Sequence, residues 1–114
     1  MALQNEIKNE VENALRKFCE RRVPEHVRDK VRLNFPIRGN SVILFEERPR
    51  WNKPTEWINS KVAQFRFDPL TNKWSLHCRD WNGRWHNYTL VQPEKDFNEL
   101  LGEVDRDPTG IFWG

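Results

Sequence analysis

The sequence predicts an α+β domain, in which a five-stranded antiparallel meander sheet carries an N-terminal and a C-terminal helix on one face. Two patterns support this prediction. Apolar residues recur every three or four positions near both ends of the chain, whereas they alternate with polar residues in the middle. Short turn signals containing Gly, Asn or Pro separate the alternating runs. Strands joined by such short turns pair antiparallel with their neighbours.

The length and charge of the chain limit what it can be. Its 114 residues suffice for one domain spanning 1–114, which needs no disulfide or metal for stability. The net charge of +2 is unevenly spread: residues 31–92 carry ten Lys and Arg against five Asp and Glu, and residues 93–114 carry two against six. The basic middle and the acidic end could each serve a partner, or they could attract each other.

Two helices are predicted, one near each end of the chain. Residues 2–22 combine an apolar stripe with a charged side, and the cations near the end of this segment suit the helix dipole. Residues 93–105 follow Gln92 and begin with Pro93 and acidic residues, which are typical of a first helical turn. The tail, residues 106–114, holds three consecutive apolar residues that we expect to pack against the core.

Five strands are predicted, at residues 30–38, 41–48, 61–68, 73–81 and 84–91. The first hairpin should place Arg32 opposite Glu47 as a cross-strand ion pair. In the next hairpin, pairing Asp68 with Lys73 directs one set of side chains inward. A two-residue turn at Asn82-Gly83 selects the same core face independently. The expected core residues of these strands are Phe65, Phe67, Trp74 and Leu76.

Residues 48–57 interrupt the alternation. Pro49 and Pro54 argue against a central strand, because proline lacks the N–H that a sheet ladder requires. We therefore predict an ordered loop here. Loops often carry function, so its Arg50, Trp51 and Trp57 are candidate binding residues.

The outer face of the sheet is the main candidate surface. With Asn82-Gly83 as a two-residue turn, the paired strands should present cations, imidazoles and aromatic rings on the side away from the helices. The predicted members of this surface are Arg66, His77, Arg79, Trp81, Arg84, His86 and Tyr88.

Catalytic arrangements find little support in the sequence. His77 and Cys78 are strand neighbours and should point to opposite faces, so they cannot form a nucleophile and its base. The neighbours Glu46 and Glu47 are separated in the same way, and we expect Glu46 to pair with Arg48 or Arg50 instead. The histidines lack the closely spaced ligands typical of a zinc site. We expect no enzyme activity, no metal and no cofactor.

The location of the protein follows from what the sequence lacks. No apolar run approaches the roughly 20 residues that a membrane span requires, and residues 1–20 are heavily charged. Cys19 and Cys78 each fall on a predicted apolar face and should be buried thiols. We expect a cytoplasmic protein with no membrane partner.

Three stretches of the chain are distinctive: residues 46–51 (EERPRW), 84–88 (RWHNY) and 104–114 (VDRDPTGIFWG). Together they resemble a family of short bacterial proteins known only as a domain of unknown function. Such proteins typically carry an FEIRPRW-like core, a KWHxY strand, an ending like FxG and an EKRRP stretch, which residues 20–24 match loosely. The chain departs from this pattern at Arg84, where Lys is usual, and in the glycine-containing turn before it. The resemblance covers Phe18 to Gly114 and implies a single domain, with no known activity.

Two hypotheses on function remain open. The first is a protein-interaction or self-association domain, acting on a protein partner or as a homodimer through the outer sheet face and the Trp51–Trp57 loop. The second is binding of single-stranded nucleic acid by the same face, since cations that follow a phosphate backbone and aromatic rings that stack bases typify such sites.

Overall fold

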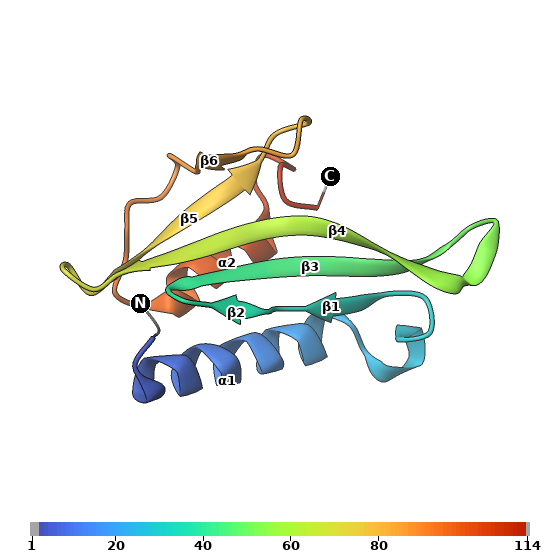
Figure 1. Cartoon of the computed structure of the whole chain (residues 1–114), viewed down its shortest axis with the longest axis horizontal. Helices are drawn as coiled ribbons and strands as arrows, with labels where there is room; N and C mark the ends of the chain where they lie inside the picture. The colour runs from blue at the N-terminus through green and yellow to red at the C-terminus, as the bar shows by residue number, and fades with distance from the viewer. Residues whose placement is uncertain (1–2, 114) are drawn as a thin grey trace.

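The computed structural model describes residues 3–113, which form two α-helices and one antiparallel sheet (Figure 1). The sheet order is β1-β3-β4-β5-β6, and β2 also pairs with β3. The elements are α1 (Asn5–Arg22), the short 3-10 helix η1 (Glu25–Val27), β1 (Arg32–Asn34), β2 (Ile37–Arg38), β3 (Ser41–Arg50), β4 (Lys53–Asp68), β5 (Lys73–Arg79), β6 (Trp85–Asn87) and α2 (Phe97–Arg106).

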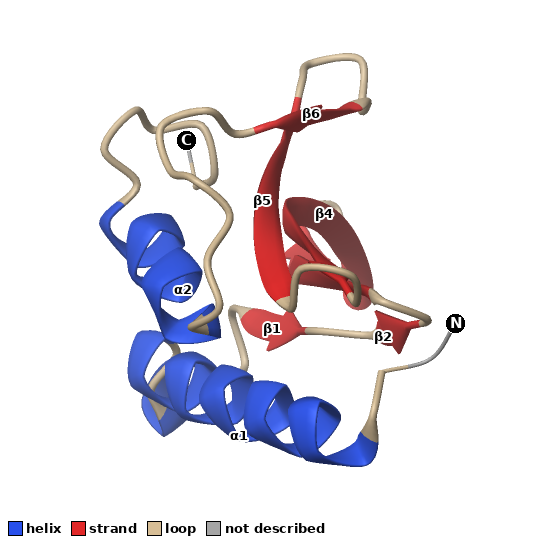
Figure 2. Ribbon diagram, turned by 90° about the vertical axis from the view of Figure 1, so that its left-hand side faces the viewer, coloured by secondary structure: helices blue, strands red, loops and turns tan. Residues whose placement is uncertain are grey.

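Both helices lie on the same side of the sheet, and the other face is left open (Figure 2). This arrangement confirms the predicted α+β class. The core lies between the two layers and includes Leu15 of α1, Phe65 of β4 and Leu100 of α2, all fully buried. Trp74 is buried as predicted, with its ring centre 5.1 Å from that of Phe67 and 5.0 Å from that of Phe97.

The helices start later than their sequence patterns predict. The first helix was predicted to begin at Ala2, which lies outside the described residues, and α1 begins at Asn5. The second helix begins at Phe97 rather than at residue 93, because Glu94 exchanges two backbone hydrogen bonds with Trp74 (2.7 and 2.9 Å) and stays extended. Asp96 then caps α2 by accepting a hydrogen bond from the Asn98 N–H at 3.0 Å.

The predicted first strand is split by Pro36. β1 and β2 keep one common register against β3, with Arg32 opposite Glu47 as predicted. Between them the strand is interrupted, since Pro36 has no N–H to donate, although its carbonyl still accepts from the Ile43 N–H at 3.2 Å. The predicted Arg32–Glu47 ion pair is wrong: the Arg32 guanidinium lies over the Trp57 ring, 3.8 Å from its centre.

The predicted loop at residues 48–57 is a continuation of the sheet. β3 runs on to Arg50, the chain turns at Trp51-Asn52, and β4 begins at Lys53, so the two strands form a projecting ribbon (Figure 1). The argument from proline failed because β1 pairs with β3 only as far as Glu47. Beyond that residue both strands are edges, where proline can direct its nitrogen away from the ladder.

The hairpin at Asn82-Gly83 has a different register from the prediction. Arg79 pairs with Trp85, Cys78 with His86 and His77 with Asn87, which is one residue out of step with a two-residue turn. The turn has three residues between Asp80 and Arg84, and Gly83 adopts φ +82°. The Gly83 N–H donates to the Asp80 carbonyl at 3.0 Å, as in a type I turn followed by a left-handed glycine. β6 is also much shorter than predicted.

The tail packs against the core, as predicted. Asp107 ends α2 with φ 44°, and its carboxylate accepts from the backbone N–H groups of Phe112 (3.1 Å) and Trp113 (3.0 Å). Phe112 is buried, and the indole N–H of Trp113 donates to the Val104 carbonyl at 2.8 Å. Asp107 is therefore both a helix end and the anchor of the segment that follows it.

Candidate functional site

The outer face of the sheet is ordered in three rungs that run across its strands. In the first rung, Ser41 lies between Arg38 and Arg66. The second rung is uncharged on its central strands, where Ile43 pairs with Gln64. The third rung pairs Phe45 with Lys61, and Arg79 with Trp85 further across the sheet. Because strands rise about 3.3 Å per residue, neighbouring rungs are roughly 7 Å apart.

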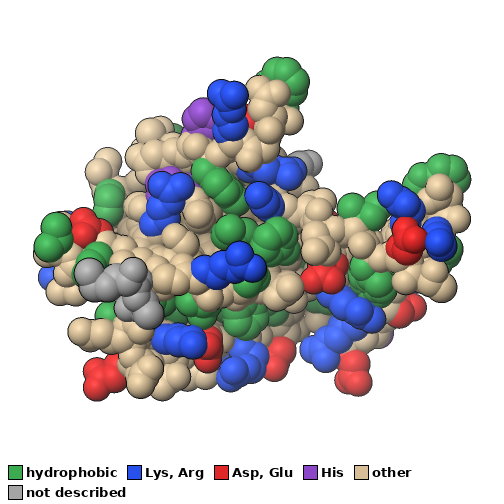
Figure 3. All heavy atoms as spheres, viewed as in Figure 1, with side chains coloured by type: hydrophobic (Ala, Val, Ile, Leu, Met, Phe, Trp, Pro, Cys, Tyr) green, Lys and Arg blue, Asp and Glu red, His purple; other side chains and the backbone are tan. Residues whose placement is uncertain are grey.

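An apolar pocket of about 260 Å³ opens between the first and third rungs. Pro36, Ile43 and Phe45 provide its apolar surface, and Arg38 and Lys61 also line it. In Figure 3 this region is an apolar patch on the central strands with Lys and Arg side chains around it. A flat apolar group that carries negative charge at its edges would match both parts of this pocket.

The cations of this face are not paired with acids among residues 3–113. Within residues 3–113, no carboxylate lies within 4.0 Å of the side-chain nitrogens of Arg38, Lys61, Arg66 or Arg79. Six cations elsewhere in the described chain are paired with acids, namely Arg21 and Arg22 with Asp105, Arg48 with Glu46, Arg50 and Lys53 with Glu56, and Arg106 with Glu103. The outer sheet face therefore keeps its positive charge available to an anion.

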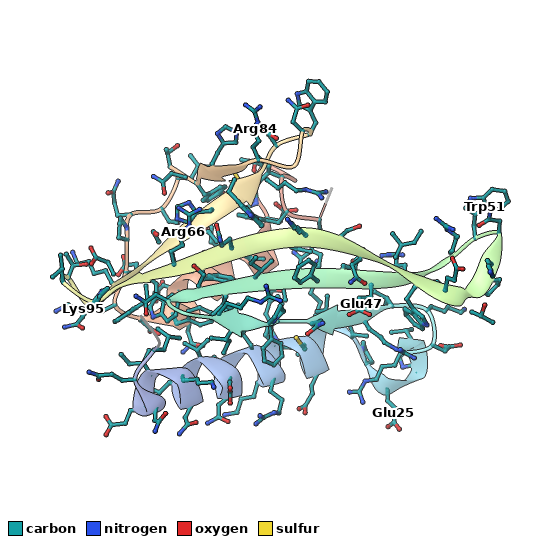
Figure 4. The ribbon with its side chains drawn as sticks, in the orientation of Figure 1. Glu25, Glu47, Trp51, Arg66, Arg84 and Lys95 are labelled. Atoms are coloured by element: carbon teal, nitrogen blue, oxygen red, sulfur yellow. The ribbon has the colours of Figure 1, made fainter. Side chains whose placement is uncertain are left out.

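His77 belongs to this face but carries no charge near neutral pH. It is buried, and its Nε2 lies 2.9 Å from the Ser75 hydroxyl. Burial, and then the positive charge of Arg66, lower the pKa of His77 to about 4. Arg66 itself donates from Nε to the Gln64 side-chain oxygen at 3.0 Å, which orients its guanidinium on the open face (Figure 4).

Trp85 is a member of the face that the sequence analysis missed. It is half-buried opposite Arg79, and the Lys61 ammonium lies 6.0 Å from its ring centre. The predicted two-residue turn would place the Trp85 side chain on the helix-covered side of the sheet, so Trp85 is absent from the predicted surface. Asp80 with Gly83 three residues later is a type I turn signal that predicts the observed register.

Tyr88 and His86 leave the face because of the same shift in register. The Tyr88 N–H donates to the Leu76 carbonyl, and its side chain is buried, with the hydroxyl donating to Glu103 at 2.7 Å. His86 turns to the side of Cys78, and its Nε2 lies 2.6 Å from Asp80 Oδ2. Tyr88 is therefore buried away from the outer face, and His86 is held by Asp80 at the end of the hairpin.

The shift brings Cys78, His86 and Asp80 to one end of the sheet, a combination of residue types known from thiol nucleophiles. However, burial, together with the nearby Asp80, raises the pKa of the Cys78 thiol. A nucleophilic cysteine requires the opposite shift, toward the thiolate. Cys19 is half-buried rather than buried as predicted, and burial raises its pKa as well, to about 11.

The remaining candidates lie on two separate projections. Trp81, 94% exposed, and Arg84 lie in the turn between β5 and β6. Trp51, 91% exposed, lies at the tip of the β3–β4 ribbon, far from Arg84 in Figure 4. Arg50 on the ribbon pairs with Glu56 at 3.1 Å. The ribbon extends away from the body, so its tip and the outer face are distinct surfaces.

Among residues 3–113, no three His, Cys, Asp or Glu side chains lie close enough together to hold a metal ion. Neither helix in the described part of the chain has the length and apolar character needed to cross a bilayer.

Comparisons with known proteins identify one family. The model of a family described as "Domain of unknown function (DUF3024)" matches residues 3–114. Searches of the curated proteins and of the solved structures found no match to this chain.

Proposed function

This chain belongs to the DUF3024 family of domains of unknown function, and we propose that it is a non-catalytic binding domain whose outer sheet face binds single-stranded nucleic acid. The observation that carries the proposal is the pocket of Pro36, Ile43 and Phe45 with Arg38 and Lys61 at its edge. A nucleobase is a flat, largely apolar ring joined to an anionic backbone, which corresponds to the two parts of this pocket.

The rest of the face extends this match beyond one nucleotide. Arg66 and Arg79 lie on neighbouring strands, and Trp85 supplies a second aromatic surface next to Arg79. Four cations without carboxylate partners among residues 3–113 could follow a phosphate backbone across the sheet. Aromatic stacking of bases adds roughly 1–3 kcal/mol per base and tolerates any sequence, so we expect weak sequence preference.

A cytoplasmic location is part of the proposal. Both cysteines are free, as is usual in a reducing compartment. Single-stranded RNA and DNA are both present there, and the 2′-hydroxyl of RNA would distinguish them.

The test is a fluorescence anisotropy titration with a labelled mixed-sequence single strand at three salt concentrations. If Arg38, Lys61, Arg66 and Arg79 each neutralise one phosphate, log affinity should fall against log salt with a slope near −3, since each contact contributes about 0.7. Arg66→Gln should weaken binding and reduce that slope by about 0.7. Lys17→Gln removes the same charge from the exposed side of α1 and should change neither quantity.

Stacking is tested separately from charge. Trp85→Leu should weaken binding with an unchanged salt slope, because stacking releases no counterions. Equal losses for Arg66→Gln and Lys17→Gln would show that only the overall charge matters. No binding by micromolar protein at low salt would reject the proposal.

A second candidate function rests on the exposed Trp51 and Trp81. Two tryptophans more than 90% exposed at projecting turns are costly in water and are typical anchors of protein interfaces. We propose a protein partner, or a second copy of the chain, as their occupant. Sedimentation of the free protein and of Trp51→Ala and Trp81→Ala variants tests self-association: a dimer that either variant dissociates supports it. A monomer at all concentrations leaves a different protein as the partner, to be sought by capture on wild-type protein with Trp51→Ala as the control.

A further inference from the structure

A second pocket, of about 300 Å³, lies where the end of α1 and the connection after it meet β1. This corner of the molecule is marked by Glu25 in Figure 4 and is separate from the outer sheet face. Cys19, Val23, Leu33 and Phe35 provide its apolar lining. Leu33 and Phe35 are only partly covered by the core, so the pocket offers apolar surface to a ligand.

Arg28 and Arg32 belong to the polar lining of the same pocket. Arg28 and Arg32 each use Nε to donate to a backbone carbonyl, that of Val23 and that of Arg28 respectively, both at 3.4 Å. Arg32 is held further by its position over the Trp57 ring. These contacts leave the terminal NH2 groups of both residues available, and no carboxylate within residues 3–113 lies within 4.0 Å of them.

The charge around the pocket is strongly one-sided. Arg16 joins Arg28 and Arg32 in the lining, against the single carboxylate of Glu20. The Cys19 thiol stays neutral, since burial and the charge of Glu20 raise its pKa to about 11. An apolar floor beside two oriented guanidinium groups is suited to a molecule that is apolar at one end and an oxyanion at the other.

We propose that this pocket binds a small amphipathic carboxylate, with the carboxylate on Arg28 and Arg32 and the apolar group against Val23, Leu33 and Phe35. A carboxylate fits because its two oxygens match the paired N–H groups of a guanidinium. The ligand must be small, because the pocket volume is at the lower end of the range for ligand sites. This proposal is independent of nucleic-acid binding on the sheet face.

The test is an NMR titration of the isotope-labelled protein with octanoate, octan-1-ol and acetate. Octanoate should shift the amide signals of Val23, Leu33 and Phe35, whereas octan-1-ol lacks the charge and acetate lacks the chain. Octan-1-ol should bind about tenfold more weakly or worse, since a hydrogen bond to a charged group contributes about that factor. Acetate should also bind more weakly, because it has no apolar chain to bury against the pocket. The dipeptide acid acetyl-Gly-Leu distinguishes two possible natural ligands that both carry a carboxylate. If it binds more tightly than octanoate, the natural ligand is the C-terminus of a peptide. If it binds more weakly, the natural ligand is a free small acid.

Single-charge variants locate the carboxylate. Arg28→Gln should weaken octanoate binding about tenfold, while Lys8→Gln, which removes a charge from the exposed side of α1, should leave it unchanged. If Arg28→Gln fails to fold, Arg16→Gln replaces it. The Arg16 side chain is exposed and donates a hydrogen bond to Asn13, so its replacement should not disturb the fold. It should reduce the affinity for octanoate by less than Arg28→Gln does. Equal binding of octanoate and octan-1-ol, or amide shifts elsewhere in the protein, would overturn the proposal.

Discussion

Tyr88 donates its phenolic hydrogen to Oε2 of Glu103 at 2.7 Å, and both side chains are buried between the sheet and α2. The contact joins the end of the last hairpin to the C-terminal helix. It depends on the three-residue turn before β6, because a two-residue turn would direct Tyr88 to the open face.

Tyr88→Phe should lower the free energy of unfolding by about 1–3 kcal/mol, because the change leaves a buried carboxylate oxygen without its donor. Urea unfolding at neutral pH measures the loss. Arg106 also donates to Glu103, at Oε1, and should limit the effect. A Tyr88→Phe variant as stable as the wild type would contradict the buried contact.

The stability of the protein should also fall at alkaline pH. Burial, and then the hydrogen bond to Glu103, raise the pKa of Tyr88 to about 12, above the value of about 10 in an unfolded chain. This contribution is complete below pH 10 and is lost as the pH rises through 12. Tyr88 is the only tyrosine in the sequence, so phenolate absorbance reports its titration directly. A midpoint near pH 10 in the folded protein would contradict the prediction.

Trp74→Ala and Trp81→Ala should differ sharply in stability. Trp74 is 2% exposed and packed between aromatic rings, so its loss should cost about 3–5 kcal/mol. Trp81 is 94% exposed, and its replacement should cost no more than about 0.5 kcal/mol. Denaturant midpoints of the two variants measure the difference, and similar losses would show that the sheet faces are assigned wrongly.

The tail should contribute to stability through a specific contact with α1. The Arg22 guanidinium lies 3.7 Å from the ring centre of Trp113, and Asp105 holds Arg22 at 2.9 Å. A double-mutant cycle of Arg22→Ala and Trp113→Ala should give a coupling of about 0.5–2 kcal/mol. Deletion of residues 111–114 should lower the melting temperature, since Phe112 is buried. An unchanged melting temperature would show that the tail is not part of the core.

His77 should titrate well below the usual range of histidine. Its pKa of about 4 predicts that stability is complete above about pH 6.5 and that the His77 contribution is lost as the pH falls through 4. Imidazole NMR signals measure the midpoint. Arg66→Gln should raise it, because a positive charge is removed, while Lys17→Gln on the other side of the protein serves as the control. A midpoint of 6 or above would place His77 in contact with water.

Local patterns in the sequence were enough to predict the two helices, the antiparallel sheet and the register between β4 and β5. Apolar stripes report which side of an element is buried, and Asn72, with φ 55°, closes that turn in the left-handed conformation that asparagine tolerates. The pairing of Glu46 with Arg48, at 2.8 Å, and the packing of the tail were predicted correctly for similar reasons. Each of these features depends on neighbouring residues or on apolar burial alone.

Two features went beyond the patterns used for prediction: the tertiary structure decided one, and a local turn set the other. The free-energy cost of proline within a strand depends on whether another strand must accept a hydrogen bond from that position. No residue of β1 lies opposite Pro49, because the pairing of β1 with β3 reaches only Glu47. The turn before β6 is instead set locally by the Asp80 carboxylate, which accepts from the N–H groups of Asn82 and Arg84, both at 2.9 Å. Since strand side chains alternate, this single extra turn residue moved Tyr88 into the core toward Glu103, 15 residues away, and left Trp85 on the open face.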